Sequence, residues 1–96
     1  MRIILSKFGT TLVSRPNGKE ELTVFQPTLK LLPETEQLEV DFEGVFTFSP
    51  SWGDEFLTPL QNQLKDRLVM LNYSNLSVKE TLRTLEEIHS FKFNLR

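Results

Sequence analysis

The chain has 96 residues, a formal net charge of -2, one histidine and no cysteine. A chain of this length builds one small core, so we predict a single domain over residues 1–96. The near-neutral charge provides no field that would draw in a polyanion, which argues against general nucleic-acid binding. Disulfide frameworks and cysteine-ligated metal sites are excluded. The apolar start of the chain is too short for a signal sequence or a membrane span, so we expect a cytoplasmic protein.

The first half of the chain is predicted to contain strands around one helix. Short β-favouring pieces lie at 3–5 and 11–13. Apolar residues then recur every three or four positions over 19–32, which predicts a helix with one apolar face. Pro27 removes a backbone donor inside this helix, so we expect a kink or two short helical pieces. Residues 38–48 are rich in β-formers and predict an extended segment in the centre of the sheet.

A second helix and a buried strand are predicted next. The Ser-Pro-Ser sequence at 49–51 ends the extended segment, and apolar residues at helical spacing follow as far as Lys65. Pro59 fits the first position of a helix, so this helix is expected to start twice. The near-continuous apolar run 67–73 predicts a strand that is covered on both faces.

The last third of the chain carries a helix start signal. Ser77 and Glu80 have the spacing of a capping box, in which each side chain bonds to the other residue's amide. We therefore predict a third helix from Ser77 to about His89, where the histidine suits the negative end of the helix dipole. The tail 91–96 is an edge strand or a frayed end. The alternation of strands and helices predicts an α/β fold with parallel neighbours and right-handed crossovers.

The end of the central segment holds the candidate site residues. Ser49 and Ser51 stand where a helix begins, so either one serves as an N-cap or receives a regulatory phosphate. Trp52 belongs either to the core or to a docking surface. Asp54 and Glu55 are expected in the first turn of the helix, where they suit the dipole but repel a phosphate.

Four carboxylates, Asp41, Glu43, Asp54 and Glu55, are expected near one end of the sheet. Oxygen ligands of this kind can hold a hydrated magnesium ion, but acids in a first helical turn and on an exposed strand explain them without a metal. We therefore predict no metal and no cofactor. The lone His89 is expected to act as a capping cation and not as a catalyst.

Two blocks of the sequence resemble a known family. Residues 40–56 read VDFEGVFTFSPSWGDEF, and residues 8–15 read FGTTLVSR, with Gly18 following. Together they resemble the STAS-like domains catalogued as a family of unknown function, which is similar to the STAS domains of anti-sigma-factor antagonists. The resemblance implies an α/β fold with a mixed, partly parallel sheet of roughly four or five strands and about three helices mainly on one side. Ser14, Arg15 and Gly18 form its secondary motif.

The resemblance also implies a function. In the antagonists, a serine at the start of the helix after the central strand is phosphorylated by a histidine-kinase-like ATPase, which is also the binding partner. When the sequence is laid on that pattern without gaps, the phosphorylated position falls on Pro50, and only a shift of one residue brings in Ser49 or Ser51. The resemblance therefore implies that this chain shares the antagonists' recognition surface, but it does not imply that this chain is phosphorylated.

The sequence thus predicts a regulatory protein-interaction module and not an enzyme. Its expected partner is a protein such as a histidine-kinase-like ATPase. The expected contact residues are Ser49, Ser51, Trp52, Asp54 and Glu55. One alternative is a STAS variant that binds a nucleotide or small ligand at a helix N-terminus or at the turn from Ser14 to Gly18. The other is an enzyme that uses the carboxylates.

Overall fold

The computed structural model describes all residues 1–96. Six strands, three α-helices and two 3-10 turns follow one another along the chain. In chain order they are β1 (Arg2–Ile4), η1 (Leu5–Lys7), β2 (Thr11–Leu12), α1 (Arg15–Leu29), β3 (Leu38–Asp41), β4 (Thr47–Phe48), α2 (Pro50–Leu64), η2 (Lys65–Arg67), β5 (Leu68–Leu71), α3 (Leu76–His89) and β6 (Asn94–Leu95). The predicted α/β fold is confirmed. No helix has both the length and the apolar composition that crossing a bilayer requires.

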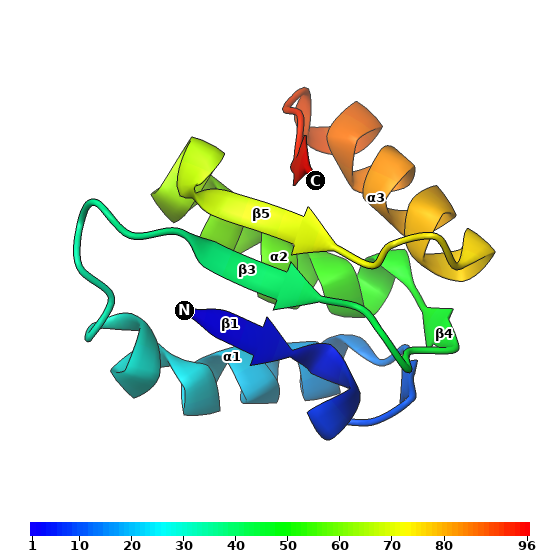
Figure 1. The fold of residues 1–96 in the computed structure, drawn as a ribbon. Coiled ribbons are helices and arrows are strands. Elements are labelled where there is room, and N and C mark those ends of the chain that lie inside the picture. Colours follow the sequence, from blue (N-terminus) through cyan, green and yellow to red (C-terminus); the bar gives the residue numbers. More distant parts are fainter.

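The main sheet has four strands in the order β1-β3-β5-β6, and every pair is parallel. The strand order steps steadily in one direction. Right-handed crossovers that always step the same way leave their helices on the same face of the sheet. Figure 1 shows α1 and α2 behind β1, β3 and β5, with α3 beside the C-terminal strand. The resulting core lies between this sheet and the helices.

A second, two-stranded sheet pairs β2 with β4, again in parallel. Residues 45–48 therefore do not extend the central strand, and that prediction is wrong. The chain leaves the main sheet after β3 because Asp41 Oδ1 accepts a hydrogen bond from the Glu43 amide at 2.9 Å. Gly44 then adopts a φ of 86°, a left-handed conformation that glycine tolerates best. The chain thus turns away before the second apolar run begins.

Helix α1 begins four residues before the predicted boundary. Ser14 accepts a hydrogen bond from the Asn17 amide at 3.1 Å, and Pro16 lies in the first turn, where its missing amide hydrogen is harmless. Pro27 lies in the last turn and does not split the helix. Pro59 likewise stays inside one continuous α2. The predicted second start of α2 is wrong, because burial of Phe56, Leu60 and Leu64 on either side of Pro59 holds the helix together.

Helix α3 is capped by a different residue from the predicted one. Asn75 accepts a hydrogen bond from the Val78 amide at 3.1 Å, so the helix starts at Leu76. The hydroxyl of Ser77 instead accepts from the Phe48 amide at 2.8 Å and donates to the Phe48 carbonyl at 3.1 Å. These bonds tie α3 to β4. The capping box is wrong because tertiary contacts take up the serine hydroxyl.

Candidate functional site

The small sheet sets the starting points of α1 and α2. β2 runs directly into α1, and β4 runs directly into α2, so pairing the two strands in parallel places both helix starts at the same end. The pairing continues past the strands, because the Ser49 amide donates to the Leu12 carbonyl at 3.0 Å. The Ser49 hydroxyl donates to the Val13 carbonyl at 2.8 Å. The two helix starts therefore lie next to each other.

Both helix starts have the same local design. Ser49 caps α2 by accepting from the Trp52 amide at 3.3 Å, as Ser14 does for α1. A proline lies in the first turn of each helix. A glycine follows each serine by four residues, and its amide donates to the serine carbonyl, at 3.1 Å for Gly18 and 2.9 Å for Gly53. The motif Ser-x-x-x-Gly thus occurs twice, once in each helix.

Gly18 allows the two helices to approach closely. A Cβ atom at this position would lie 2.7 Å from the Trp52 carbonyl oxygen. The Trp52 indole Nε1 donates to Asn17 Oδ1 at 2.8 Å, which joins the same two turns through side chains. Only glycine fits between these backbones, so Gly18 fixes how near the start of α1 lies to the start of α2.

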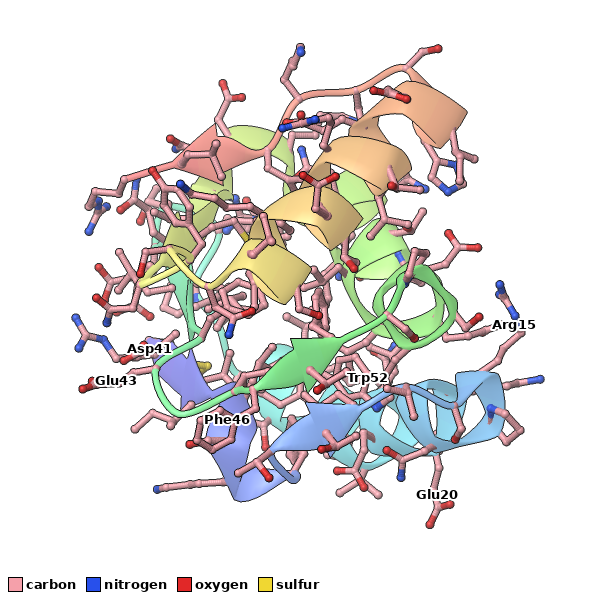
Figure 2. All side chains as sticks on the ribbon, turned by 90° about the vertical axis from the view of Figure 1, so that its right-hand side faces the viewer. Arg15, Glu20, Asp41, Glu43, Phe46 and Trp52 are labelled. Carbon is pink, nitrogen blue, oxygen red and sulfur yellow. The ribbon has the colours of Figure 1, made fainter.

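A charged cluster covers this contact on the outside. Arg15 Nη1 lies 3.0 Å from Glu55 Oε1 and 3.3 Å from Asp54 Oδ2. His89 Nε2, at the end of α3, lies 2.6 Å from Asp54 Oδ1. The Thr58 hydroxyl donates to the same oxygen at 2.9 Å. Figure 2 shows Arg15 projecting from the start of α1 toward α2, while Glu20 points away on the far side of α1.

These contacts change the ionisation of Asp54. Partial burial raises the pKa of Asp54, but hydrogen bonds from His89, Thr58 and Arg15 together outweigh burial, and the pKa falls below its ordinary value. The hydrogen bond to Glu55, followed by the one to Asp54, raises the pKa of Arg15. The cluster therefore favours the charged form of both partners, and Asp54 is a carboxylate at neutral pH.

Replacing Asp54 by asparagine is expected to cost about 1 kcal/mol of the free energy of unfolding at neutral pH, because charge-assisted hydrogen bonds are lost. A lowered folded-state pKa stabilises the protein above the unfolded-state pKa, and that contribution is lost as the pH falls through the folded-state value. The difference between wild type and Asp54→Asn should shrink as the pH falls below about 4. Urea unfolding at each pH measures it.

The matched control is Glu20→Gln, which removes an exposed α1 carboxylate that has no ion-pair partner. Its stability should match the wild type at every pH. An undiminished difference between wild type and Asp54→Asn at the acid end of the titration would contradict the role given to the Asp54 carboxylate.

The structure brings most of the predicted site residues together. Ser14, Arg15, Ser49, Ser51, Asp54 and Glu55 lie on one side of the two helix starts, and we call this set the helix-start surface. It follows β4 of the small sheet and not the central strand of the main sheet, which corrects the predicted position. Because α2 begins at Pro50, Asp54 and Glu55 come after its first turn.

Trp52 does not belong to the helix-start surface. Its side chain is 0% exposed and stacks on Phe56 with ring centroids 4.8 Å apart. Figure 2 shows it inside, between α1 and the strand that leads into α2. The predicted role of Trp52 as a contact residue is therefore wrong, because a fully buried ring offers no area to a partner. Of the two predicted alternatives for Trp52, the structure shows that it is a core residue.

The four carboxylates do not converge. Asp41 accepts from the Asn72 side chain at 2.9 Å, at the end of β3 and β5. Figure 2 shows Asp41 and Glu43 on the sheet side of the molecule, opposite Arg15, which holds Asp54 and Glu55. No group of three or more histidine, aspartate or glutamate side chains is arranged to hold a metal ion.

The helix-start surface is poorly suited to binding an anion through backbone amides. Each helix start carries a proline, which has no amide hydrogen, and each capping serine already occupies one of the remaining donors. Asp54 and Glu55 add negative charge beside α2. The chemistry of this surface is instead that of ion pairing and hydrogen bonding with another polar surface.

Three side chains that were not assigned to the site from the sequence complete it. His89 and Thr58 bond to Asp54, and Asn17 bonds to Trp52. Thr58 follows Asp54 by four residues on the same helix, so helical spacing could have revealed that pair. Asp54 and His89 are 35 positions apart, and nothing in the sequence links them.

Comparisons with known proteins add no relative: no family model, no curated protein and no solved structure matches the chain.

Proposed function

We propose that this chain is a small regulatory protein-interaction domain that acts in the cytoplasm and binds its partner through the helix-start surface. The observation that carries the proposal is the convergence of the two Ser-x-x-x-Gly turns, which were separate blocks in the sequence. They present one charged surface held by contacts from three helices. Such a surface is organised before a partner arrives, so binding loses little conformational entropy.

The shape of the helix-start surface favours a protein partner over a small molecule. Small ligands bind in concave pockets that bury most of their surface. The three main hollows of this molecule, of about 420 to 640 Å³, are lined by other residues. A partner that covers the helix starts from outside therefore suits them better than a ligand that enters a cleft.

The charged residues give the surface its specificity. Asp54 and Glu55 carry two negative charges against the single positive charge of Arg15, so the surface suits a partner with a basic patch. We take the partner to be a histidine-kinase-like ATPase, which is what the sequence resemblance implies. Trp52 supports the surface from below and does not contact the partner.

If a serine of this surface is phosphorylated, the proposal favours Ser51 over Ser49. The Ser49 hydroxyl is already used twice, by Val13 and by the Trp52 amide. Ser51 is half-buried and makes no side-chain hydrogen bond within the chain. A phosphate on Ser51 would add negative charge one helical turn from Asp54 and Glu55 and would change the surface that the partner meets.

The test is affinity capture with the full chain. Replacing the half-buried Ser51 by arginine places a long cation where the partner docks, and it breaks no bond within the chain. We expect Ser51→Arg to lose at least about tenfold of the histidine-kinase-like ATPase captured by the wild type, because a charge of the wrong sign opposes a basic patch. Quantitative mass spectrometry of the captured proteins measures it.

Glu20→Arg is the control, since it introduces the same residue on the side of α1 that points away from α2. It should capture the partner as well as the wild type does. Equal capture by Ser51→Arg and Glu20→Arg would reject the helix-start surface as the binding site.

A further inference from the structure

The free edge of β1 is a second feature of the fold, separate from the helix-start surface. β1 lies at one border of the main sheet, paired only with β3. Figure 1 shows it as the lowest strand of the main sheet, with no further strand of that sheet beside it. An edge strand presents unpaired amides and carbonyls to any chain that can align with it.

The hydrogen bonds of β1 show which groups are free. Met1 faces β3, because its amine donates to the Gln37 carbonyl at 3.1 Å and its carbonyl accepts from the Glu39 amide at 2.8 Å. Backbone groups alternate in direction along a strand, so Ile3 also faces β3 and Arg2 faces outward. The amide and the carbonyl of Arg2 have no partner within the chain. Arg2 therefore offers one free hydrogen-bond donor and one free acceptor to a strand that pairs at this edge.

A groove of about 470 Å³ runs beside the same edge, between β1 and α1. Its apolar lining comes from Met1, Ile3, Ile4, Phe8 and Phe25. The lining includes two charged side chains, Arg2 and Lys7, which are both basic, and no acid. Arg2 pairs with two carboxylates, with Nε 3.5 Å from Glu39 Oε1 and Nη1 3.9 Å from Asp41 Oδ2. Lys7 is exposed and has no carboxylate within ion-pair distance. The groove thus combines an apolar floor with one unpaired positive charge, that of Lys7.

We propose that the free edge of β1 binds an extended peptide segment in which apolar and acidic residues alternate, so that the segment adds a further strand to the sheet. The partner's backbone would exchange both hydrogen bonds with Arg2, as an added strand does. Its apolar side chains would enter the groove over Phe8 and Phe25, and an acidic side chain would meet Lys7.

Charge argues against a second copy of this chain as the occupant. Pairing β1 with β1 of another copy through the free groups of Arg2 would place the two Arg2 side chains opposite each other, and like charges that face each other oppose pairing. The groove beside β6, at the opposite border, carries Glu86 and Glu87 as well as basic residues. Because both signs of charge are present, the groove beside β6 favours neither an acidic nor a basic partner. The acidic segment therefore fits the β1 edge specifically.

The test is a titration of the isotope-labelled full chain, followed by NMR, with a short synthetic peptide in which valine alternates with glutamate. We expect amide shifts at Arg2, Ile4 and Lys7, and slower hydrogen exchange of the Arg2 amide. Lys7→Glu should weaken binding about fivefold, since an attraction becomes a repulsion. A peptide with lysine in place of glutamate should bind more weakly still.

Two substitutions at one position separate the backbone from the side chain. Arg2→Ala keeps the outward amide, whereas Arg2→Pro removes it and leaves the bonds to β3 intact, as an edge strand allows. We expect Arg2→Ala to bind the peptide about fivefold more tightly than Arg2→Pro, the effect of one hydrogen bond. If Arg2→Pro does not fold, the wild type is titrated with peptides methylated on one or the other set of alternate amides, and only one set should abolish binding.

Several results would overturn the proposal. These are equal affinity for the glutamate and lysine peptides, equal affinity of Arg2→Ala and Arg2→Pro, equal binding of the two methylated peptides, or shifts that map away from β1. A dimer in sedimentation that Lys7→Glu strengthens would assign the edge to a second copy instead. None of these results bears on the helix-start surface, which lies at the other end of α1.

Discussion

Replacing Trp52 by alanine is expected to lower the free energy of unfolding by about 3 to 5 kcal/mol, as removal of a fully buried aromatic side chain does. The indole packs between three phenylalanine rings, with centroids 4.8 Å away for Phe56, 5.7 Å for Phe48 and 6.4 Å for Phe8. It also holds Asn17 at the start of α1. Since a small domain has a stability of about 5 to 15 kcal/mol, this one change removes a large share of it.

Chemical denaturation of Trp52→Ala and Trp52→Phe measures this effect. The phenylalanine variant keeps a ring in the core and should lose less than the alanine variant. Leu31→Ala is the control, because Leu31 is 77% exposed and its loss should change stability by less than about 0.5 kcal/mol. A Trp52→Ala variant as stable as Leu31→Ala would show that the indole is not in the core.

Gly18→Ala is expected to destabilise the chain by about 1 to 3 kcal/mol through overpacking, although alanine favours a helix over glycine by about 1 kcal/mol. The added Cβ would meet the Trp52 carbonyl oxygen at 2.7 Å. A backbone oxygen cannot move aside alone, so α1 and α2 must separate. Because that separation also shifts Arg15 away from Asp54 and Glu55, the variant should bind its partner less well even where it is folded.

Gly53→Ala provides the matched comparison, in the other Ser-x-x-x-Gly turn. A Cβ there would meet side-chain atoms, the nearest being Leu85 Cδ1 at 3.0 Å. Side-chain ends can shift by a few tenths of an ångström, and the gain in helix propensity offsets part of the cost. We expect Gly53→Ala to stay within about 1 kcal/mol of the wild type. Thermal unfolding that ranks Gly53→Ala below Gly18→Ala would contradict the close approach at Gly18.

The sequence pattern was sufficient for the fold class and for the elements that bury a clear face. The apolar run of β5 and the apolar face of α3 follow from periodicity alone. The departure of β4 from the main sheet could not be predicted in the same way. It depends on a single side-chain bond from Asp41 and a left-handed Gly44, both of which act through local geometry and not through hydrophobic pattern.

The sequence predicted the separate parts of the site but not how they come together. The blocks around Ser14 and Ser49 were both identified, but their contact depends on pairing β2 with β4, and two-residue strands leave no recognisable pattern. Burial of Trp52 depends on its packing against Phe8, Phe48 and Phe56, and Phe8 lies far from Trp52 in the chain. The Ser-x-x-x-Gly motif shares too few positions to be detected as an internal repeat. The arrangement of the site therefore depends on tertiary contacts, which local sequence patterns do not reveal.

The central claim is that a partner binds at the helix-start surface, and site-specific photocrosslinking inside cells tests it most directly. A photoreactive amino acid at position 51 lies on that surface, and one at position 20 lies on the opposite side of α1. We predict a discrete crosslinked adduct with a histidine-kinase-like ATPase from position 51 and none from position 20. No adduct from position 51, or the same adduct from both positions, would contradict the account.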